Sequence, residues 1–224
     1  MTQPAPLPAF IFDMDGVVVN SNDLHVESWK EVARRHGFDC ADPDHIGKCG
    51  LRTVAVIRDL LRCPVSEEDA ARIGFEKEEI YREWVRADGI EAIPGVLEFL
   101  AQARHLGIPC AIGSSAPREN VEACLQALRL EETFMATVSG ADVQHGKPAP
   151  DIFLKAAGKM GIAPHQCLVF EDAPAGIAAA HAAGMRVLAL ATSHSLDEIA
   201  AADSIAPNFI PLRPSAVQAG WRPL

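Results

Sequence analysis

Short runs of apolar residues alternate with amphipathic stretches along most of the chain. Five runs have the length of buried strands, at residues 9–12, 109–113, 136–139, 167–170 and 186–190. Apolar residues at helical spacing predict helices at residues 24–36, 96–105, 118–128, 151–160 and 175–183. Strands that alternate with helices predict βαβ units. The chain is therefore expected to be an α/β protein with a Rossmann-like parallel sheet, covered by helices on both faces.

The pattern changes after the first predicted strand. Residues 67–86 are charged and amphipathic, contain no strand-like run and are expected to be helical. We predict a helical domain at residues 22–90, inserted into an α/β core domain of residues 1–21 and 91–224. The Pro-rich tail after Pro207 is expected to run over the surface.

Composition and charge restrict which binding partners and which cellular compartment we expect. The 224 residues are 49% apolar and carry a net charge of −10, which disfavours nucleic acid and anionic membranes as partners. No stretch of about 18 apolar residues occurs, so no membrane span is expected. Residues 1–8 have no basic region and do not read as a signal peptide. Six scattered cysteines without a C-x-x-C pair indicate reduced thiols. We expect a cytoplasmic monomer.

The first predicted strand ends in two carboxylates, Asp13 and Asp15, followed by Gly16. Two ionised carboxylates ~4 Å apart repel each other by roughly 4 kcal/mol at an effective dielectric constant near 20. A bound divalent cation would relieve this repulsion. The alternative is a polar loop in which both side chains point into solvent.

Other predicted strands also end in polar residues. Ser114 and Ser115 follow the strand at residues 109–113, and Glu171 and Asp172 follow the strand at residues 167–170. The carboxyl ends of parallel strands form the edge where ligands bind, and the loop around Lys147 adds a positive charge. Carboxylates for Mg²⁺, with a hydroxyl and an ammonium group for phosphate oxygens, suit phosphoryl transfer. An Asp can act as the nucleophile.

With these four motifs in this order, the chain resembles the haloacid dehalogenase superfamily of phosphohydrolases, over roughly residues 10–190. It is most similar to the subgroup with a helical cap inserted after the first strand, which includes β-phosphoglucomutase and small sugar-phosphate phosphatases. The resemblance implies that Asp13 is the nucleophile and Asp15 the general acid and base. It implies that Ser114 hydrogen-bonds the transferring phosphate and that Lys147 neutralises phosphate and aspartate together.

The resemblance also implies a Mg²⁺ site. Its ligands are the Asp13 carboxylate, the Asp15 backbone carbonyl and the acidic pair of Glu171 and Asp172, of which Asp172 is the expected direct ligand. Haloacid dehalogenases themselves lack the second aspartate of the first motif. Asp15 therefore favours a phosphate substrate over an organohalide.

The cap supplies candidate substrate-binding residues. The resemblance implies that His25, Arg52 and Lys77 face the site, although Arg52 and Lys77 could equally be solvated charges on helical faces. Ser115 and Arg118 are further candidates, since they follow the motif serine.

The residues after that serine bear on the reaction type. The mutase grips a second phosphate there with a Ser-Lys-Asn run, whereas Ala116 and Pro117 cannot do so and Arg118 could substitute only in part. This departure favours a Mg²⁺-dependent phosphatase that hydrolyses a small phosphorylated metabolite through an aspartyl-phosphate, and we expect the substrate to be a sugar phosphate. The alternatives are a β-phosphoglucomutase-like phosphomutase with the same nucleophile and, from another class, a non-catalytic sugar-phosphate sensor.

Overall fold

The computed structural model describes residues 9–37 and 66–220, with side chains described to residue 217. The chain divides into two compact units, residues 1–20 with 91–224 and residues 21–90. Among the described residues, no helix has the length and apolar character needed to cross a membrane.

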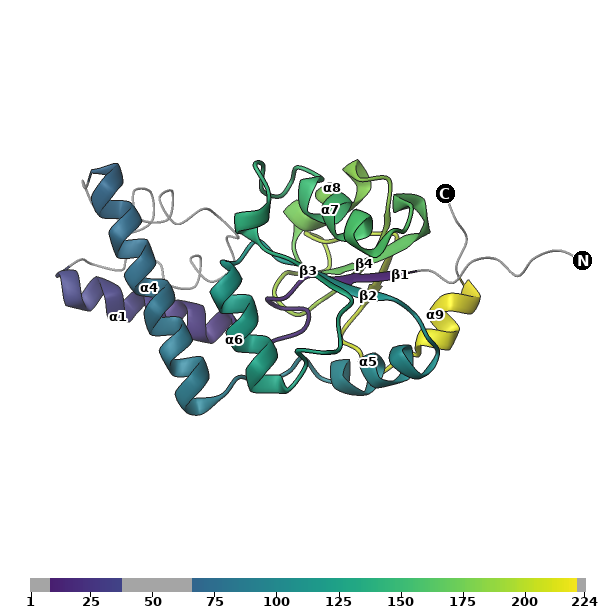
Figure 1. The fold of residues 1–224 in the computed structure, drawn as a ribbon, viewed down its shortest axis with the longest axis horizontal. Helices are drawn as coiled ribbons and strands as arrows, with labels where there is room; N and C mark the ends of the chain where they lie inside the picture. The colour runs from purple at the N-terminus through teal and green to yellow at the C-terminus, as the bar shows by residue number, and fades with distance from the viewer. Residues whose placement is uncertain (1–8, 38–65, 221–224) are drawn as a thin grey trace, which may run out of the picture. The chain divides into compact units, whose positions relative to one another are not determined.

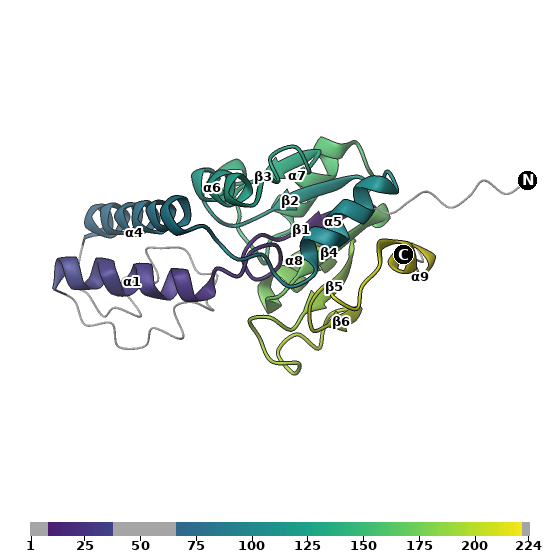
Figure 2. The same ribbon diagram turned by 90° about the horizontal axis from the view of Figure 1, so that it is seen from below.

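The larger unit is built on a six-stranded sheet in the order β3-β2-β1-β4-β5-β6, in which every neighbouring pair is parallel (Figure 1 labels β1 to β4, and Figure 2 labels all six strands). The strands are β1 (Ala9–Phe12), β2 (Cys110–Gly113), β3 (Ala136–Val138), β4 (Cys167–Glu171), β5 (Arg186–Leu190) and β6 (Ser204–Ala206). The parallel α/β architecture predicted from the sequence is confirmed. The short edge strand β6 was not predicted.

Helices connect these strands. They are α5 (Val96–His105), α6 (Arg118–Leu128), α7 (Asp151–Met160) and α8 (Pro174–Ala182), with 3₁₀ turns η2 (Gly140–Asp142) and η3 (Pro164–Gln166). A last helix, α9 (Pro214–Gly220), follows β6. The bounds predicted for α5, α6 and α7 are confirmed to the residue.

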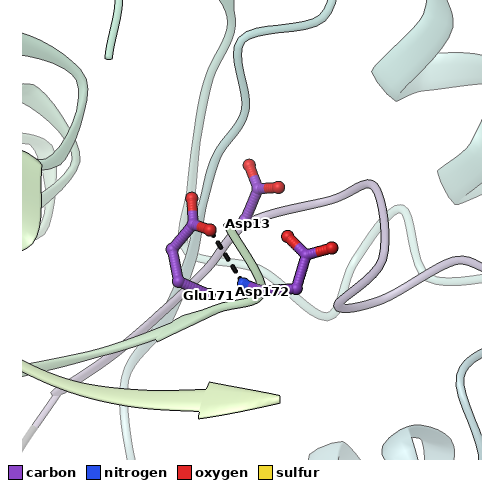
Figure 3. A group of neighbouring side chains, drawn as sticks. All are labelled: Asp13, Glu171 and Asp172. Atoms are coloured by element: carbon purple, nitrogen blue, oxygen red, sulfur yellow. Dashed lines mark hydrogen bonds between the residues drawn. The ribbon is translucent and has the colours of Figure 1, made fainter. Parts of the chain in front are cut away.

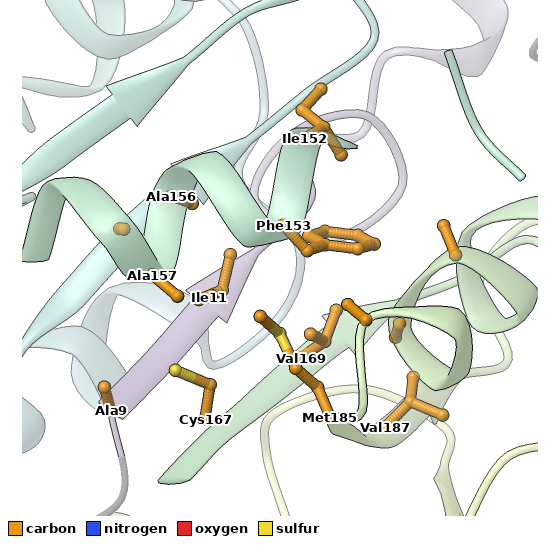
Figure 4. Close-up of a cluster of buried hydrophobic side chains, with 14 of the residues drawn as sticks. Ala9, Ile11, Ile152, Phe153, Ala156, Ala157, Cys167, Val169, Met185 and Val187 are labelled. Carbon is orange, nitrogen blue, oxygen red and sulfur yellow. The ribbon is translucent and has the colours of Figure 1, made fainter. Parts of the chain in front are cut away.

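The central strand β1 is buried along its whole length, because alternate side chains enter two different cores. On one face, Ala9 and Ile11 pack with Phe153 of α7 and Ile177 of α8 (Figure 4). On the other face, Phe10 and Phe12 join an aromatic cluster. This explains why the sequence of β1 is an unbroken apolar run rather than an alternation of apolar and polar residues.

The aromatic cluster corrects one expectation about the tail. Phe209 is 1% exposed, and its ring centroid lies 5.0 Å from that of Phe99 and 5.3 Å from that of Phe170. The tail after Pro207 therefore does not simply run over the surface. Burying a Phe side chain is worth roughly 1.5–3 kcal/mol, which is enough to anchor a segment whose proline content hides this role in the sequence.

In the smaller unit, α1 (Asn22–His36) and α4 (Glu67–Asp88) lie side by side (Figure 2). Each buries an apolar stripe, which includes Trp29 on α1 and Tyr81 on α4. The first helix ends at Gly37 in the left-handed conformation, with φ 71°. The Ser66 hydroxyl caps the start of α4 by accepting a 3.0 Å hydrogen bond from the Asp69 amide.

Candidate active site

Parallel pairing brings the predicted acidic residues to one edge of the sheet. Phe12 of β1 is in register with Ile112 of β2 and Phe170 of β4. The Asp13 amide extends the β1–β4 ladder by donating a 2.9 Å hydrogen bond to the Phe170 carbonyl. Asp13 is therefore held by backbone pairing at the carboxyl end of the central strand, and it is only 8% exposed.

A tight turn follows Asp13 and carries Asp15. The Met14 carbonyl accepts hydrogen bonds from the amides of Val18 (2.8 Å) and Val19 (3.0 Å). Gly16 has φ 75°, and a Cβ atom at this position would overlap the Asp172 carboxylate. The glycine is thus required both by the left-handed backbone and by the close approach of Asp172.

Lys147 connects the acidic residues of two strands. Its Nζ lies 2.6 Å from Asp13 Oδ1 and 2.6 Å from Glu171 Oε1. The side chain is 9% exposed and its ammonium group lies 4.9 Å from the ring centroid of Phe153. The loop before α7 therefore delivers a buried positive charge to the ends of β1 and β4.

Glu171 holds neighbouring groups in place at this edge of the sheet. Its Oε2 accepts hydrogen bonds from the backbone amides of Asp172 (2.8 Å) and Ala173 (2.9 Å), and its Oε1 accepts one from Lys147. A Cβ atom at Gly176 would overlap this carboxylate. Glu171 thus holds both Lys147 and the turn that carries Asp172, and the Gly176 backbone leaves room for it.

Three buried carboxylates gather at this point, those of Asp13, Glu171 and Asp172 (Figure 3). One oxygen atom from each lies within 4.8 Å of the others. Carboxylate and carbonyl oxygens are the ligands that Mg²⁺ prefers. The donor set therefore fits a hard divalent cation. Asp13 and Asp172 are the better candidates, because both carboxylate oxygens of Glu171 are already engaged, whereas Lys147 contacts only Oδ1 of Asp13.

The pKa shifts indicate a deficit of positive charge at the cluster. Burial, followed by smaller contributions from Glu171 and Asp15, raises the pKa of Asp13 to about 7 against the attraction of Lys147. Burial and the neighbouring carboxylates also raise the pKa of Asp172. For Lys147 burial lowers the pKa, but Asp13 and Glu171 outweigh burial and the net shift is upward. One ammonium group serves several acids, so a further cation would be stabilised here.

Ser114 follows β2 at the same edge and is fully buried. Its amide donates to the Val138 carbonyl (3.0 Å), and its Oγ accepts a 3.1 Å hydrogen bond from the Ala116 amide. The hydroxyl can still donate its own proton, as recognition of a phosphate oxygen requires. Ser115 is exposed. Arg118 is half-exposed, and its Nη2 forms a 2.7 Å ion pair with Asp142.

Three of the candidate substrate-binding residues were predicted in the cap segment. Arg52 lies outside the described residues. Lys77 and His25 contact each other, with 2.7 Å between Lys77 Nζ and His25 Nδ1. Lys77 is 2% exposed, and its ammonium group lies within about 5.5 Å of the ring centroids of Trp29 and Tyr81. The alternative of a solvated charge on a helical face is therefore wrong for Lys77.

Two residues at the site were missed from the sequence. Thr192 Oγ1 donates a 2.6 Å hydrogen bond to the Gly16 carbonyl, and the Ser193 hydroxyl donates to the Asp172 carboxylate. Both follow β5, a predicted strand. The rule that identified Ser114 and Asp172, polar residues just after a strand, would have found them too.

Comparison with known proteins gives matches along most of the chain. The family model described as haloacid dehalogenase-like hydrolase matches residues 10–190. The fructose-1-phosphate phosphatase YqaB of Escherichia coli (strain K12) is 36% identical over 175 residues, which cover 78% of this chain and 92% of that protein. Hexitol phosphatase A of the same organism is 35% identical over 185 residues, covering 81% of this chain and 82% of that protein.

A solved structure extends the likeness in fold. The crystal structure of β-phosphoglucomutase from Clostridium difficile superimposes with a TM-score of 0.81 at 23% identity, and the match covers 96% of each chain. At this level of identity the comparison shows the shared fold alone.

Proposed function

Because this chain belongs to the haloacid dehalogenase-like hydrolases, we propose that it is a Mg²⁺-dependent phosphatase that acts on small sugar phosphates through an aspartyl-phosphate. The observation that carries the proposal is the buried contact of 2.6 Å between Lys147 Nζ and Asp13 Oδ1, beside the carboxylate of Asp172. A carboxylate and a phosphate dianion repel each other, and the protein as a whole carries a net charge of −10. A nucleophilic carboxylate therefore needs a positive charge beside it to react with a phosphate ester.

In the proposed first step, an Asp13 carboxylate oxygen forms a bond to phosphorus while the bond from phosphorus to the sugar oxygen breaks. Asp15 gives its proton to the departing oxygen. In the second step, Asp15 takes a proton from water, whose oxygen bonds to phosphorus and releases Asp13 and inorganic phosphate. Lys147 and Ser114 stabilise the negative charge of the phosphoryl oxygens in both steps.

Mg²⁺, when bound, would supply further positive charge to those oxygens and reduce the repulsion between substrate and carboxylates. Asp13, the backbone carbonyl of Asp15 and Asp172 are the proposed ligands. Glu171 holds Lys147 and the turn before α8, rather than serving as a principal ligand.

The proposed substrate class rests on the relatives. Both curated relatives are named as phosphatases, one of fructose 1-phosphate and one of hexitol phosphates. In the smaller unit, the buried Lys77 and the half-buried His25 provide a polar pair with the chemistry to recognise sugar oxygens. We further propose that the chain acts as a monomer on a free metabolite, with no nucleic-acid or membrane partner.

The test is a panel of phosphate esters in the presence of Mg²⁺ or of EDTA. Fructose 1-phosphate, sorbitol 6-phosphate, 4-nitrophenyl phosphate and β-glucose 1-phosphate with a trace of glucose 1,6-bisphosphate are each assayed for inorganic phosphate and for isomerised sugar phosphate. We expect phosphate release that depends on Mg²⁺. Conversion of β-glucose 1-phosphate to glucose 6-phosphate without phosphate release would replace the phosphatase with a mutase.

Asp13→Asn provides the control for the nucleophile. It removes the negative charge with little change in size, so the fold should persist while turnover is abolished. Substantial Mg²⁺-dependent turnover in this variant would exclude the aspartyl-phosphate route. Failure of the wild-type protein to release phosphate from any ester would support the sensor alternative instead.

A further inference from the structure

We propose that Thr192 and Ser193, which follow β5, are positioning residues for the cation site, with Ser193 orienting Asp172 and Thr192 fixing the turn that carries Asp15. This inference rests on the proposed function, because it concerns the same cation. It assigns a role to a strand end outside the four motifs on which the resemblance was based.

The Thr192 contact acts on backbone. Its Oγ1 donates a 2.6 Å hydrogen bond to the Gly16 carbonyl, while the Gly16 amide donates to the Val19 carbonyl at 2.9 Å. Both polar groups of Gly16 are thereby fixed. The Asp15 carbonyl, a proposed ligand, lies in the same peptide plane as the Gly16 amide, so the bond to Val19 restrains its direction, while the Thr192 bond holds the peptide unit that follows.

The Ser193 contact acts on a side chain. Its hydroxyl donates to the Asp172 carboxylate. Gly16 packs so closely against this pair that a Cβ atom there would overlap the Asp172 carboxylate and come within 2.6 Å of Ser193 Oγ. Asp172, Ser193 and Gly16 therefore form one packed corner, in which the direction of the carboxylate is set by its donor and by the backbone beside it.

The chemistry of the donor suits a metal site. A hydroxyl adds no net charge, so it orients a carboxylate without opposing a cation, whereas a second ammonium group would compete with it. Donors of this kind hold metal ligands in a single orientation, and removing one typically costs 10–100-fold in metal affinity or activity. Ser193 can engage one carboxylate oxygen of Asp172 while the other oxygen remains available for the ion.

The experiment measures metal binding directly, without turnover. Binding of Mn²⁺ is followed by the electron paramagnetic resonance signal of the free ion, with Mg²⁺ as competitor. We expect Ser193→Ala to raise the dissociation constant about tenfold, and Ser193→Thr, which keeps a hydroxyl, to restore most of the affinity. Ser195→Ala is the matched control. It removes a hydroxyl from the same segment, but one that bonds to Glu198 on the surface.

Thr192 is tested in the same way by a pair of variants. Thr192→Val keeps the shape and removes the donor, whereas Thr192→Ser keeps the donor. The valine variant is expected to bind Mn²⁺ several-fold more weakly and to show a lower kcat at saturating Mg²⁺, because the turn carrying Asp15 is no longer fixed. The serine variant should resemble the wild type in both measurements.

The possible outcomes separate this inference from the proposed function. Wild-type protein that binds neither ion would refute the Mg²⁺ dependence itself. Wild-type binding that is unchanged in Ser193→Ala and Thr192→Val would overturn the inference and leave the phosphatase intact, even if the two variants had lower melting temperatures. If Ser193→Ala does not fold, Ser193→Cys, close in size but only a weak donor, takes its place in the comparison.

Discussion

The ammonium nitrogen of Lys147 lies 2.6 Å from Oδ1 of Asp13, although the two residues are 134 positions apart in the sequence. The same ammonium group contacts Glu171, so a single buried cation joins the central strand of the sheet to its neighbour β4. Removing the ammonium group would leave the buried carboxylates uncompensated, whereas removing the charge of Asp13 leaves Lys147 paired with Glu171. The contact therefore ties the stability of this edge of the sheet to the proposed chemistry.

Replacing Lys147 with Met should affect both properties. We expect kcat to fall about 10²–10³-fold, as happens when one preorganised donor to a developing oxyanion is lost, and the free energy of unfolding to fall by about 3–5 kcal/mol. Phosphate release and urea denaturation measure the two effects. Lys155→Met, at an exposed position on α7, is the control. A Lys147 variant with activity within tenfold of the wild type would remove the main support for the site.

The raised pKa of Asp13 predicts how stability depends on pH in the absence of metal. The group has a pKa of about 7 in the folded protein against an ordinary value of 3.8. Between these pH values the folded state holds a proton that the unfolded chain has released. The stabilisation that this group gives to the folded state is therefore complete below pH 4. It decreases as the pH rises from 4 through 7, by a few kcal/mol at most.

Urea denaturation in EDTA at pH 5.0 and 7.5 measures this effect. Asp13→Asn should flatten the dependence, whereas an equal slope in both proteins would contradict the assignment. Mg²⁺ and the proton compete for the same carboxylate. As the pH increases towards 7, the apparent affinity for Mg²⁺ should therefore increase, by up to about tenfold per pH unit.

Lys77 allows substrate recognition to be separated from folding. Its Nζ can only donate, so His25 Nδ1 accepts and the ring proton of a neutral His25 lies on Nε2. If this pair recognises sugar oxygens, Lys77→Met should lower kcat/KM about tenfold more for fructose 1-phosphate than for 4-nitrophenyl phosphate, which has no sugar hydroxyls. Lys30→Met, at an exposed position on α1, is the control. An equal loss on both substrates would indicate a structural role alone.

The regular part of the fold could be predicted because its signals are local. Helices α5, α6 and α7 bury one stripe of apolar residues each, and a repeating stripe is visible in the sequence. Strand β6 could not be predicted, because it has only three residues and only Ala206 is buried. Phe209 was missed for a different reason: its partners Phe99 and Phe170 lie far away in the sequence.

The positions of the site residues could be predicted from the strand ends, whereas the contacts between their side chains could not. That Asp13 and Glu171 would meet at one edge follows from parallel topology. That Lys147 bridges them depends on the path of a loop, which no local pattern describes. Likewise, the sequence could not distinguish an exposed Lys77 from a buried one, because Trp29, one of its two aromatic neighbours, comes from a different helix, α1.

Gly176 provides a sharp test of how Glu171 is held. It lies in α8, where alanine would ordinarily favour the helix by about 1 kcal/mol. Here a Cβ atom would overlap the Glu171 carboxylate. Gly176→Ala should therefore push Glu171 away from the Asp172 and Ala173 amides, with a loss of about 1–3 kcal/mol in stability and reduced Mg²⁺-dependent turnover.

Gly158→Ala is the matched control for this substitution. Gly158 lies in α7, and a Cβ atom there would meet nothing within 4 Å. We expect this variant to gain up to about 1 kcal/mol in stability and to keep full activity. Urea denaturation of both variants, with phosphate release as the second measurement, decides the question. If Gly176→Ala stabilised the protein as much as Gly158→Ala does, the Glu171 carboxylate could move without cost, and its role in holding Lys147 and the Asp172 turn would have to be abandoned.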